Sequence, residues 1–391
     1  MKETMRIYLT LRFLTGFGFS LEGATYTIFL KDHGLSNFEV NLMNVVCWMA
    51  MFLFQVPTGL VADVFGRKLS FLISCLFQCL GGALYGLSET MVGFAVAEVI
   101  LALGMTFSSG AFDAWVVDRL KEYGYEGPQS WVSSRATFVT YIAMILGGAI
   151  GGFLGSVDLH FPWFALAGML GLSGVYALFV MKENRGFDAH RGLEKWQRFS
   201  KTFYSSLQYL RAAKDLHFVI VVDAVFVFAV QPLNMYWQDT FKAMFAHTWV
   251  LGPIKSGISF ACLLGALLVM RFGSGKDAKR SMLLLMFATG LLVILCSCFS
   301  GTSILLLPFM LHEFTRGYYD PIKNAYLQEH LPDGERATIA SMIFMLIAFC
   351  GALGLFVSGL IAEYVSIPAS WFVSGICFIL IALYYVRKEK K

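Results

Sequence analysis

Residues 59–68 read Gly59-Leu60-Val61-Ala62-Asp63-Val64-Phe65-Gly66-Arg67-Lys68. The stretch joins two apolar segments, 38–62 and 69–88, each long enough to cross a hydrocarbon core of about 30 Å. Its two glycines permit close approach of the backbone, and its adjacent cations can stay in water while pairing with carboxylates on neighbouring helices. The stretch therefore predicts a tight, charged connection between two membrane helices.

The composition of the chain places it in a membrane. Of its 391 residues 57% are hydrophobic and only 14% are charged, whereas soluble domains carry about 25% charged residues. A soluble globular fold is excluded. Apolar segments near 20 residues long recur along the whole chain, and we expect twelve membrane-spanning helices. Their ranges are 7–30, 38–62, 69–88, 91–118, 131–156, 161–181, 216–240, 249–272, 281–300, 302–326, 337–363 and 367–387.

The cations predict how these helices are oriented. The first segment is too long for the apolar core of a signal peptide, so we expect it to remain as helix 1. Lys and Arg gather in alternate connections and in the tail, and the positive-inside rule then predicts that both termini are cytoplasmic. These residues are Arg67, Lys68, Arg119, Lys121, Lys276, Lys279, Arg280, Arg387, Lys388, Lys390 and Lys391. The net charge of +4 is therefore a signal of topology, and we infer no nucleic-acid partner from it.

The cysteines predict no metal site and no disulfide. All eight fall inside expected spans, without a Cys-xx-Cys pair, and are interpreted as small apolar packing residues. They are Cys47, Cys75, Cys79, Cys262, Cys296, Cys298, Cys350 and Cys377.

A polar stretch divides the chain into two sets of six spans. We expect an N-terminal half at 1–181, a cytoplasmic linker at 182–215 and a C-terminal half at 216–391. Apolar residues recur in the linker at helical spacing among basic ones, which predicts an amphipathic helix on the membrane surface; a solvated linker with incidental aromatics is the alternative. Those residues are Trp196, Phe199, Phe203, Leu207 and Leu210.

The two halves also repeat each other. Three short matches occur in the same order at nearly constant offset, which indicates a duplicated six-helix unit. The matches pair Arg135-Ala136-Thr137 with Arg336-Ala337-Thr338, Gly110-Ala111-Phe112-Asp113 with Gly317-Tyr318-Tyr319-Asp320, and Trp163-Phe164 with Trp371-Phe372.

The Gly-xxx-Asp-xx-Gly-Arg-Lys pattern resembles the loop between helices 2 and 3 of the major facilitator superfamily. That resemblance implies an all-α integral membrane fold of twelve helices in two six-helix pseudo-repeats, with the substrate site between the halves. It also implies a latch at the cytoplasmic face that loosens when the carrier changes its facing. The expected gate residues are Gly59, Asp63, Gly66, Arg67, Lys68, Asp118 and Arg135. The alternative is an incidental turn whose charges lie at the membrane interface. The equivalent connection in the second half, 271–280, lacks the Asp-xx-Gly-Arg frame.

Charged residues inside the spans call for a partner or a role, because each costs at least about 2.5 kcal/mol near the bilayer centre. They concentrate in spans 1, 4, 7 and 10, which line the central cavity in the family that the chain resembles. Glu22 and Asp113 are candidates for proton coupling, as is Asp223; bonding to a nearby Arg or Tyr as part of the structure is the alternative. His312-Glu313-xx-Arg316 could relay protons or bind an anion, although Glu313 and Arg316 at i, i+3 can also neutralise each other.

A polar and aromatic run in span 7 supplies candidate substrate contacts. Pro232 can free a backbone carbonyl there, and amides with aromatic rings can hold an amphipathic ligand. An interfacial Tyr/Trp belt is the alternative. The candidates are Gln231, Asn234, Tyr236 and Trp237, with Tyr26 of span 1 at similar depth. With 37 phenylalanines in the chain, we expect an apolar, aromatic cavity that has few fixed charges.

The sequence Ala143-xxx-Gly147-Gly148-Ala149-Ile150-Gly151-Gly152 resembles the glycine-rich antiporter signature, with Ala and Gly where that signature has Gly and Pro; a generic packing stripe is the alternative. The arginine that the family carries near Ile100 in span 4 is absent. That absence weakens a direct transfer of the family's drug/proton antiport mechanism, whereas the glycine-rich signature favours export. We predict a proton-coupled exporter of small amphipathic organic compounds, similar to bacterial efflux permeases of the inner membrane, with an importer or symporter of a specific metabolite as the alternative.

We expect neither catalysis nor a cofactor, with a proton gradient as the energy source, because no nucleophile–base pair or metal-ligand set occurs at membrane depth. The expected partners are a small-molecule substrate and the lipid bilayer, and we expect a functional monomer.

Overall fold

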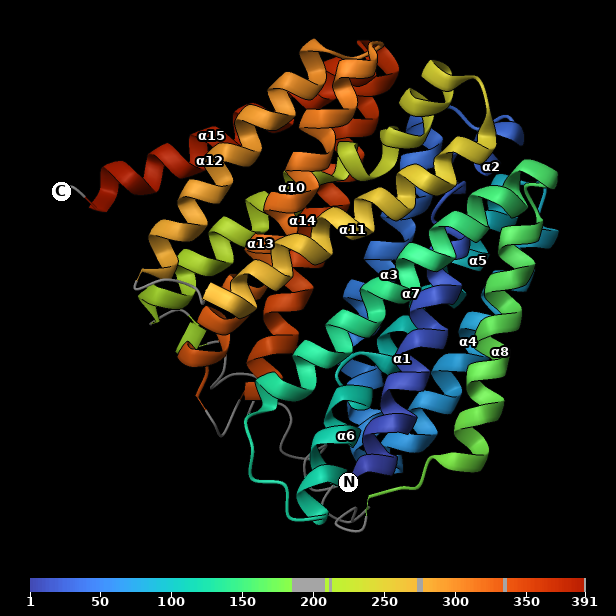
Figure 1. The fold of residues 1–391 in the computed structure, drawn as a ribbon, viewed down its shortest axis with the longest axis vertical. Helices are drawn as coiled ribbons and strands as arrows, with labels where there is room; N and C mark the ends of the chain where they lie inside the picture. The colour runs from blue at the N-terminus through green and yellow to red at the C-terminus, as the bar shows by residue number, and fades with distance from the viewer. Residues whose placement is uncertain (185–207, 211–212, 273–276, 333–335, 390–391) are drawn as a thin grey trace.

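The computed structural model describes residues 1–184, 208–210, 213–272, 277–332 and 336–389, and every regular element within them is a helix (Figure 1). The elements are α1 (Lys2–Glu22), α2 (Tyr26–Asp32), α3 (Asn37–Phe65), α4 (Arg67–Leu87), α5 (Met91–Ser108), α6 (Ala111–Glu122), α7 (Gln129–Val157), α8 (Phe161–Val180), α10 (Lys214–Phe245), the 3₁₀ turn η1 (Thr248–Val250), α11 (Leu251–Phe272), α12 (Ala278–Cys298), the 3₁₀ turn η2 (Ser303–Leu305), α13 (Leu306–His330), α14 (Arg336–Tyr364) and α15 (Ile367–Glu389).

The predicted twelve-helix membrane fold is confirmed. Ten helical segments of the described chain, with α5 and α6 taken together, are long and apolar enough to span a membrane. The pair α1–α2 and helix α13 complete the set of twelve. Helix α13 is less apolar because it carries His312, Glu313, Arg316 and Asp320 within its length.

Two expected spans are interrupted. Span 1 stops at Glu22 and resumes at Tyr26, and span 4 stops at Ser108 and resumes at Ala111. In span 4 the break follows from Gly110, whose φ of +73° favours glycine. In span 1 the amide of Gln238 on α10 satisfies backbone groups at the break: its Oε1 accepts from Thr27 N at 2.9 Å and its Nε2 donates to the Gly23 carbonyl at 3.1 Å. The expected spans 7–30 and 91–118 are therefore each built from two helices.

Figure 1 shows helices α1–α8 beside helices α10–α15, close together at the end that carries α2 and further apart at the end that carries the N-terminus. At the close end the halves meet through α3 with α14 and through α7 with α11. The glycines of α7 allow close packing on two faces. A Cβ on Gly152 would overlap Gly252 of α11 across the halves, and one on Gly151 would overlap the Leu21 backbone of α1 within the N-terminal half.

Polar contacts seal the same end. Lys31 of α2 forms an ion pair with Asp239 of α10 at 2.9 Å. The Asn41 amide of α3 donates to the Leu355 carbonyl at 2.8 Å and to Ser358 Oγ at 3.1 Å. The closed end is thus held by main-chain and side-chain bonds between the halves.

The aromatic pair that marks the sequence repeat occupies matching places. Trp163 is the third residue of α8 and Trp371 the fifth residue of α15, with 2% and 0% of their surface exposed. Trp163 stacks on Tyr85 with ring centroids 3.8 Å apart, and Trp371 Nε1 donates to the Pro232 carbonyl at 3.0 Å. Most of the predicted linker, including Trp196, lies outside the described residues.

Candidate functional site: a charged cavity between the halves

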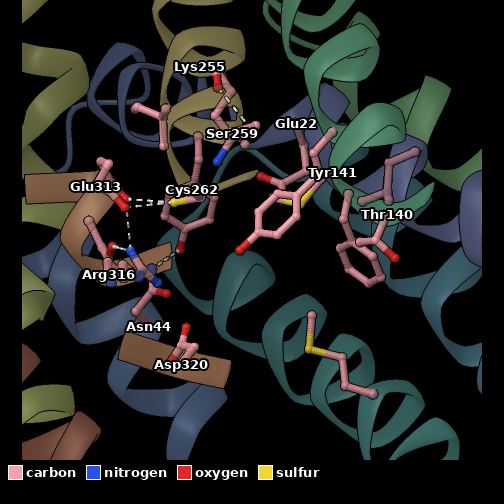
Figure 2. A pocket seen from close by; sticks show the side chains of 18 of the residues that line it. Glu22, Asn44, Thr140, Tyr141, Lys255, Ser259, Cys262, Glu313, Arg316 and Asp320 are labelled. Atoms are coloured by element: carbon pink, nitrogen blue, oxygen red, sulfur yellow. Dashed lines mark hydrogen bonds and ion pairs between the residues drawn. The ribbon is translucent and has the colours of Figure 1, made fainter. Parts of the chain in front are cut away.

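A cavity of about 690 Å³ lies between the two sets of helices. Its walls come from helices α1–α3 and α5–α8 on one side and from α10, α11 and α13 on the other. Figure 2 shows Glu22, Lys255 and Arg316 among the residues that line it. The expectation of few fixed charges was wrong. Lining residues with ionisable side chains include Arg12, Glu22, Glu98, Asp113, Lys255, Glu313, Arg316 and Asp320.

The N-terminal wall is organised around Glu98 of α5, whose surface is only 4% exposed. Glu98 Oε1 accepts hydrogen bonds from Tyr26 at 2.7 Å and from Tyr85 at 3.1 Å. Tyr26 in turn accepts from the Asn44 amide at 2.7 Å. The predicted contact residue Tyr26 therefore lines the cavity with its hydroxyl committed to this network.

The C-terminal wall is organised around Arg316 of α13. Its Nη1 donates to Asn234 Oδ1 at 2.7 Å and lies 3.7 Å from Glu313 Oε2 (Figure 2). The thiol of Cys262 donates to the same carboxylate oxygen at 3.3 Å. This arrangement is the self-neutralised pair that the sequence left open as an alternative. His312 is fully buried behind it and does not line the cavity.

Lys255 of α11 was missed by the sequence analysis. Its side chain passes through space left by two glycines: a Cβ on Gly148 would lie 2.8 Å from Lys255 Cγ, and one on Gly23 would lie 3.5 Å from Nζ. The ammonium thereby reaches the segment that carries Glu22, and both side chains line the cavity (Figure 2). A single cation one turn inside an apolar span was the available signal.

The span 7 candidates separate into two groups. Gln231, Asn234 and Trp237 line the cavity, whereas Tyr236 is fully buried and does not. With Trp237 only 4% exposed, these rings are not an interfacial belt. Helix α10 runs through Pro232 without a break.

Asp223 lies away from the cavity, in the packed core of the C-terminal half. The Lys323 ammonium contacts Asp223 Oδ1 at 3.2 Å and Asp320 Oδ1 at 3.5 Å. On the opposite side, Asp113 forms an ion pair with Arg12 and accepts a hydrogen bond from Tyr8. Both carboxylates therefore have cationic partners, and only Asp113 lines the cavity.

The connection at residues 59–68 is built at the end where the halves diverge. Gly66 alone separates α3 from α4 and has a φ of +100°, and a Cβ there would overlap the Glu183 carboxylate. Glu183 Oε2 accepts from the Lys68 backbone N–H at 2.9 Å. Arg67 forms an ion pair with Asp118.

Gly59, Asp63 and Arg67 face α14 across a hollow of about 420 Å³, whose far wall includes Thr338 and Ser341. Arg135 lies elsewhere, with its guanidinium carbon 3.6 Å from the Trp131 ring centroid. The structure thus brings most of the predicted gate together and places Arg135 apart from it.

The family model described as Major Facilitator Superfamily matches residues 8–276 and 256–391, which together cover nearly the whole chain. The chain belongs to the Major Facilitator Superfamily. It is therefore an integral membrane transporter, and the cavity between its halves is where this family binds its solutes.

Relatives within this superfamily carry both general and specific names. The chain is 24% identical over 388 residues to the uncharacterized MFS-type transporter YxaM of Bacillus subtilis, covering 97% of this chain and 94% of that one. It is 21% identical to Multidrug resistance protein 2 of Bacillus subtilis, with coverage of 100% and 96%. Among solved structures, the nucleoside transporter NupG superimposes with a TM-score of 0.74 at 14% identity over 98% of this chain and 99% of that one, which shows the shared fold.

Proposed function

We propose that the protein is a proton-coupled exporter of small amphipathic organic compounds. The observation that carries this proposal is the opposition of Glu22 and Lys255 inside the cavity, one from each half. A proton on Glu22 removes the negative charge that faces Lys255, so proton binding changes the attraction between the halves. A solute that binds among these groups competes with that proton, which is the requirement for exchange of one against the other.

The walls of the cavity fit a solute with both apolar and polar surface. Trp237 supplies an aromatic face, and Gln231 and Asn234 supply amides beside it. A volume of about 690 Å³ lies within the usual range for small-molecule sites. The name of Multidrug resistance protein 2 supports export of such compounds.

A second candidate is import or symport of a specific metabolite. It is favoured by the fold shared with NupG, a nucleoside transporter, and by the two hydrogen-bonded networks around Glu98 and Arg316. Such fixed networks suit a solute with matching polar groups.

We further propose that both termini are cytoplasmic, in a bacterial inner membrane, and that the protein acts as a monomer. In this orientation the end closed by Lys31 and Asp239 faces outward, and the connection containing Asp63, Arg67 and Lys68 faces the cytoplasm. The Arg67–Asp118 ion pair, with Gly59 and Gly66, would act as the gate. Arg67→Ala or Asp63→Asn should then slow transport of protein that remains inserted, and wild-type rates in both variants would remove the gate from the mechanism.

The coupling proposal is tested in inside-out vesicles with an acidic lumen, using ethidium as a fluorescent cationic probe. We expect wild-type protein to accumulate ethidium, and Glu22→Gln to lose accumulation while ethidium still exchanges down its own gradient. Glu89→Gln, a change at an exposed carboxylate, is the matched control. Accumulation by Glu22→Gln at the wild-type level would refute coupling through Glu22, and accumulation by wild-type protein only under the reverse gradient, with an alkaline lumen, would favour the symporter.

The substrate site is tested separately with purified protein. An aromatic contact contributes about 0.5–1.5 kcal/mol beyond its buried area, so Trp237→Ala should weaken ethidium binding roughly 2- to 13-fold. Tyr236→Phe, at a buried ring outside the cavity, should leave the affinity unchanged. Equal affinities in all three proteins would contradict the placement of the solute beside Trp237.

A further inference from the structure

A second hollow, of about 740 Å³, opens on the surface of the protein where the first turns of α1 meet the first turns of α7. Its floor is apolar and includes Met5, Leu9 and Phe13. Both helices begin at the end where the halves diverge (Figure 1). The hollow belongs to one half only, so it is distinct from the cavity between the halves.

The rim of this hollow is cationic. Lys2, Arg6 and Arg135 line it, and no carboxylate does among the residues the structure describes. Neither arginine has a carboxylate partner within that part of the chain, and both are exposed. The Arg135 guanidinium lies over the ring of Trp131, which is itself 39% exposed.

The length of α7 fits a rim at the level of lipid headgroups. Helix α7 has 29 residues, so it is about 43 Å long at 1.5 Å per residue and exceeds the hydrocarbon core of about 30 Å. The excess of about 13 Å leaves room for its first two turns, which carry Trp131 and Arg135, in the interface. Tryptophan is enriched at this depth, and arginine binds phosphate through two parallel N–H donors.

We propose that this hollow binds an anionic phospholipid. The headgroup phosphate lies between Arg6 and Arg135, with Lys2 as a further cation, and an acyl chain lies along Leu9 and Phe13. Basic pockets beside membrane helices recognise acidic headgroups in this way. A free phosphate would leave the apolar floor exposed to water, which is why a lipid is the fitting occupant.

Binding is measured by native mass spectrometry on delipidated full-length protein titrated with dioctanoyl phosphatidylglycerol. We expect a clear preference over dioctanoyl phosphatidylcholine, and a loss of roughly fivefold in affinity for each arginine removed in Arg6→Gln/Arg135→Gln. The control is Lys121→Gln/Arg387→Gln, which removes two exposed cations from other helices and should bind as wild type. Arg6→Lys/Arg135→Lys should keep most of the affinity because it keeps both charges.

Three results would overturn the proposal. These are equal binding of the two lipids, an equal loss in the control variant, and displacement of the lipid by inorganic phosphate at the lipid's own concentration. Each variant is first checked by its melting temperature, so a folding defect is separated from a loss of lipid.

Discussion

The glycine of the repeated Gly-x-x-Asp pattern has a different structural role in each half. In Gly110-Ala111-Phe112-Asp113 the glycine has a φ of +73° and divides span 4 into α5 and α6. In Gly317-Tyr318-Tyr319-Asp320 the helix α13 continues from Leu306 to His330, and Gly317 instead permits the Cys262 backbone of α11 to lie against it. A duplicated sequence therefore keeps its glycine for two separate physical reasons.

The ion pairs next to these glycines differ in the same way. In the N-terminal half Arg12 of α1 meets Asp113 of α6, and the Asp113 side chain is 58% exposed. In the C-terminal half the charges are exchanged: Asp223 of α10 meets Lys323 of α13, and the Asp223 side chain is only 11% exposed. The first pair is open to the solvent of the cavity, whereas the second is part of the packed core, so only the first is positioned to respond to protons and solutes.

The largest expected effect is at the buried pair. Lys323→Met removes the cation beside Asp223, and loss of one partner of a buried pair costs about 3–5 kcal/mol. We expect a large drop in the free energy of unfolding measured in denaturant. The double variant Asp223→Asn/Lys323→Met should recover much of it, because no buried charge then lacks a partner: the Asp320 side chain, which also contacts Lys323, is 41% exposed and can be hydrated. A single variant as stable as wild type would show that this pair is hydrated.

The second effect is at Gly317. Gly317→Ala places a methyl group against the Cys262 backbone, and overpacking of this kind typically costs about 1–3 kcal/mol. The melting temperature should fall accordingly. Gly168→Ala is a fair control, since it lies within a helix where nothing comes within 4 Å of an added Cβ. An unchanged melting temperature in Gly317→Ala would mean that α11 and α13 can separate without penalty.

The third effect is smaller and concerns Gly110. A Cβ there meets no atom within 4 Å, so Gly110→Ala costs only the backbone strain of a positive φ, about 1–2 kcal/mol. Gly110→Asn should cost about as much, because asparagine is tolerated mainly in the left-handed α region, where ψ is positive, whereas the ψ of Gly110 is −36°. If neither substitution lowers the melting temperature, the break in span 4 is held by something other than the dihedral angles of this residue.

These differences mark the limit of what the sequence could predict. The lengths of the apolar segments and the repeated tryptophans predicted where the membrane spans lie, because whether a segment can cross the bilayer depends on its own composition. The break near Tyr26 could not be predicted, since the group that satisfies it, Gln238, lies 211 residues away. Lys255 was missed for a similar reason: nothing nearby in the sequence shows that Gly23 and Gly148 leave room for its side chain.

The smallest effect on stability is expected at the open pair. Arg12→Met removes the partner of Asp113, but exposed pairs contribute only about 0–1 kcal/mol, and Asp113 is mostly exposed to the cavity. The melting temperature should therefore change little. Transport is the informative measurement, because Asp113 without Arg12 presents an additional negative charge to the solute. We expect altered ethidium uptake with near-normal stability, the reverse of the result for Lys323→Met. A stability loss as large as that of Lys323→Met would show that the two pairs are equivalent, and that the contrast between an open half and a packed half is wrong.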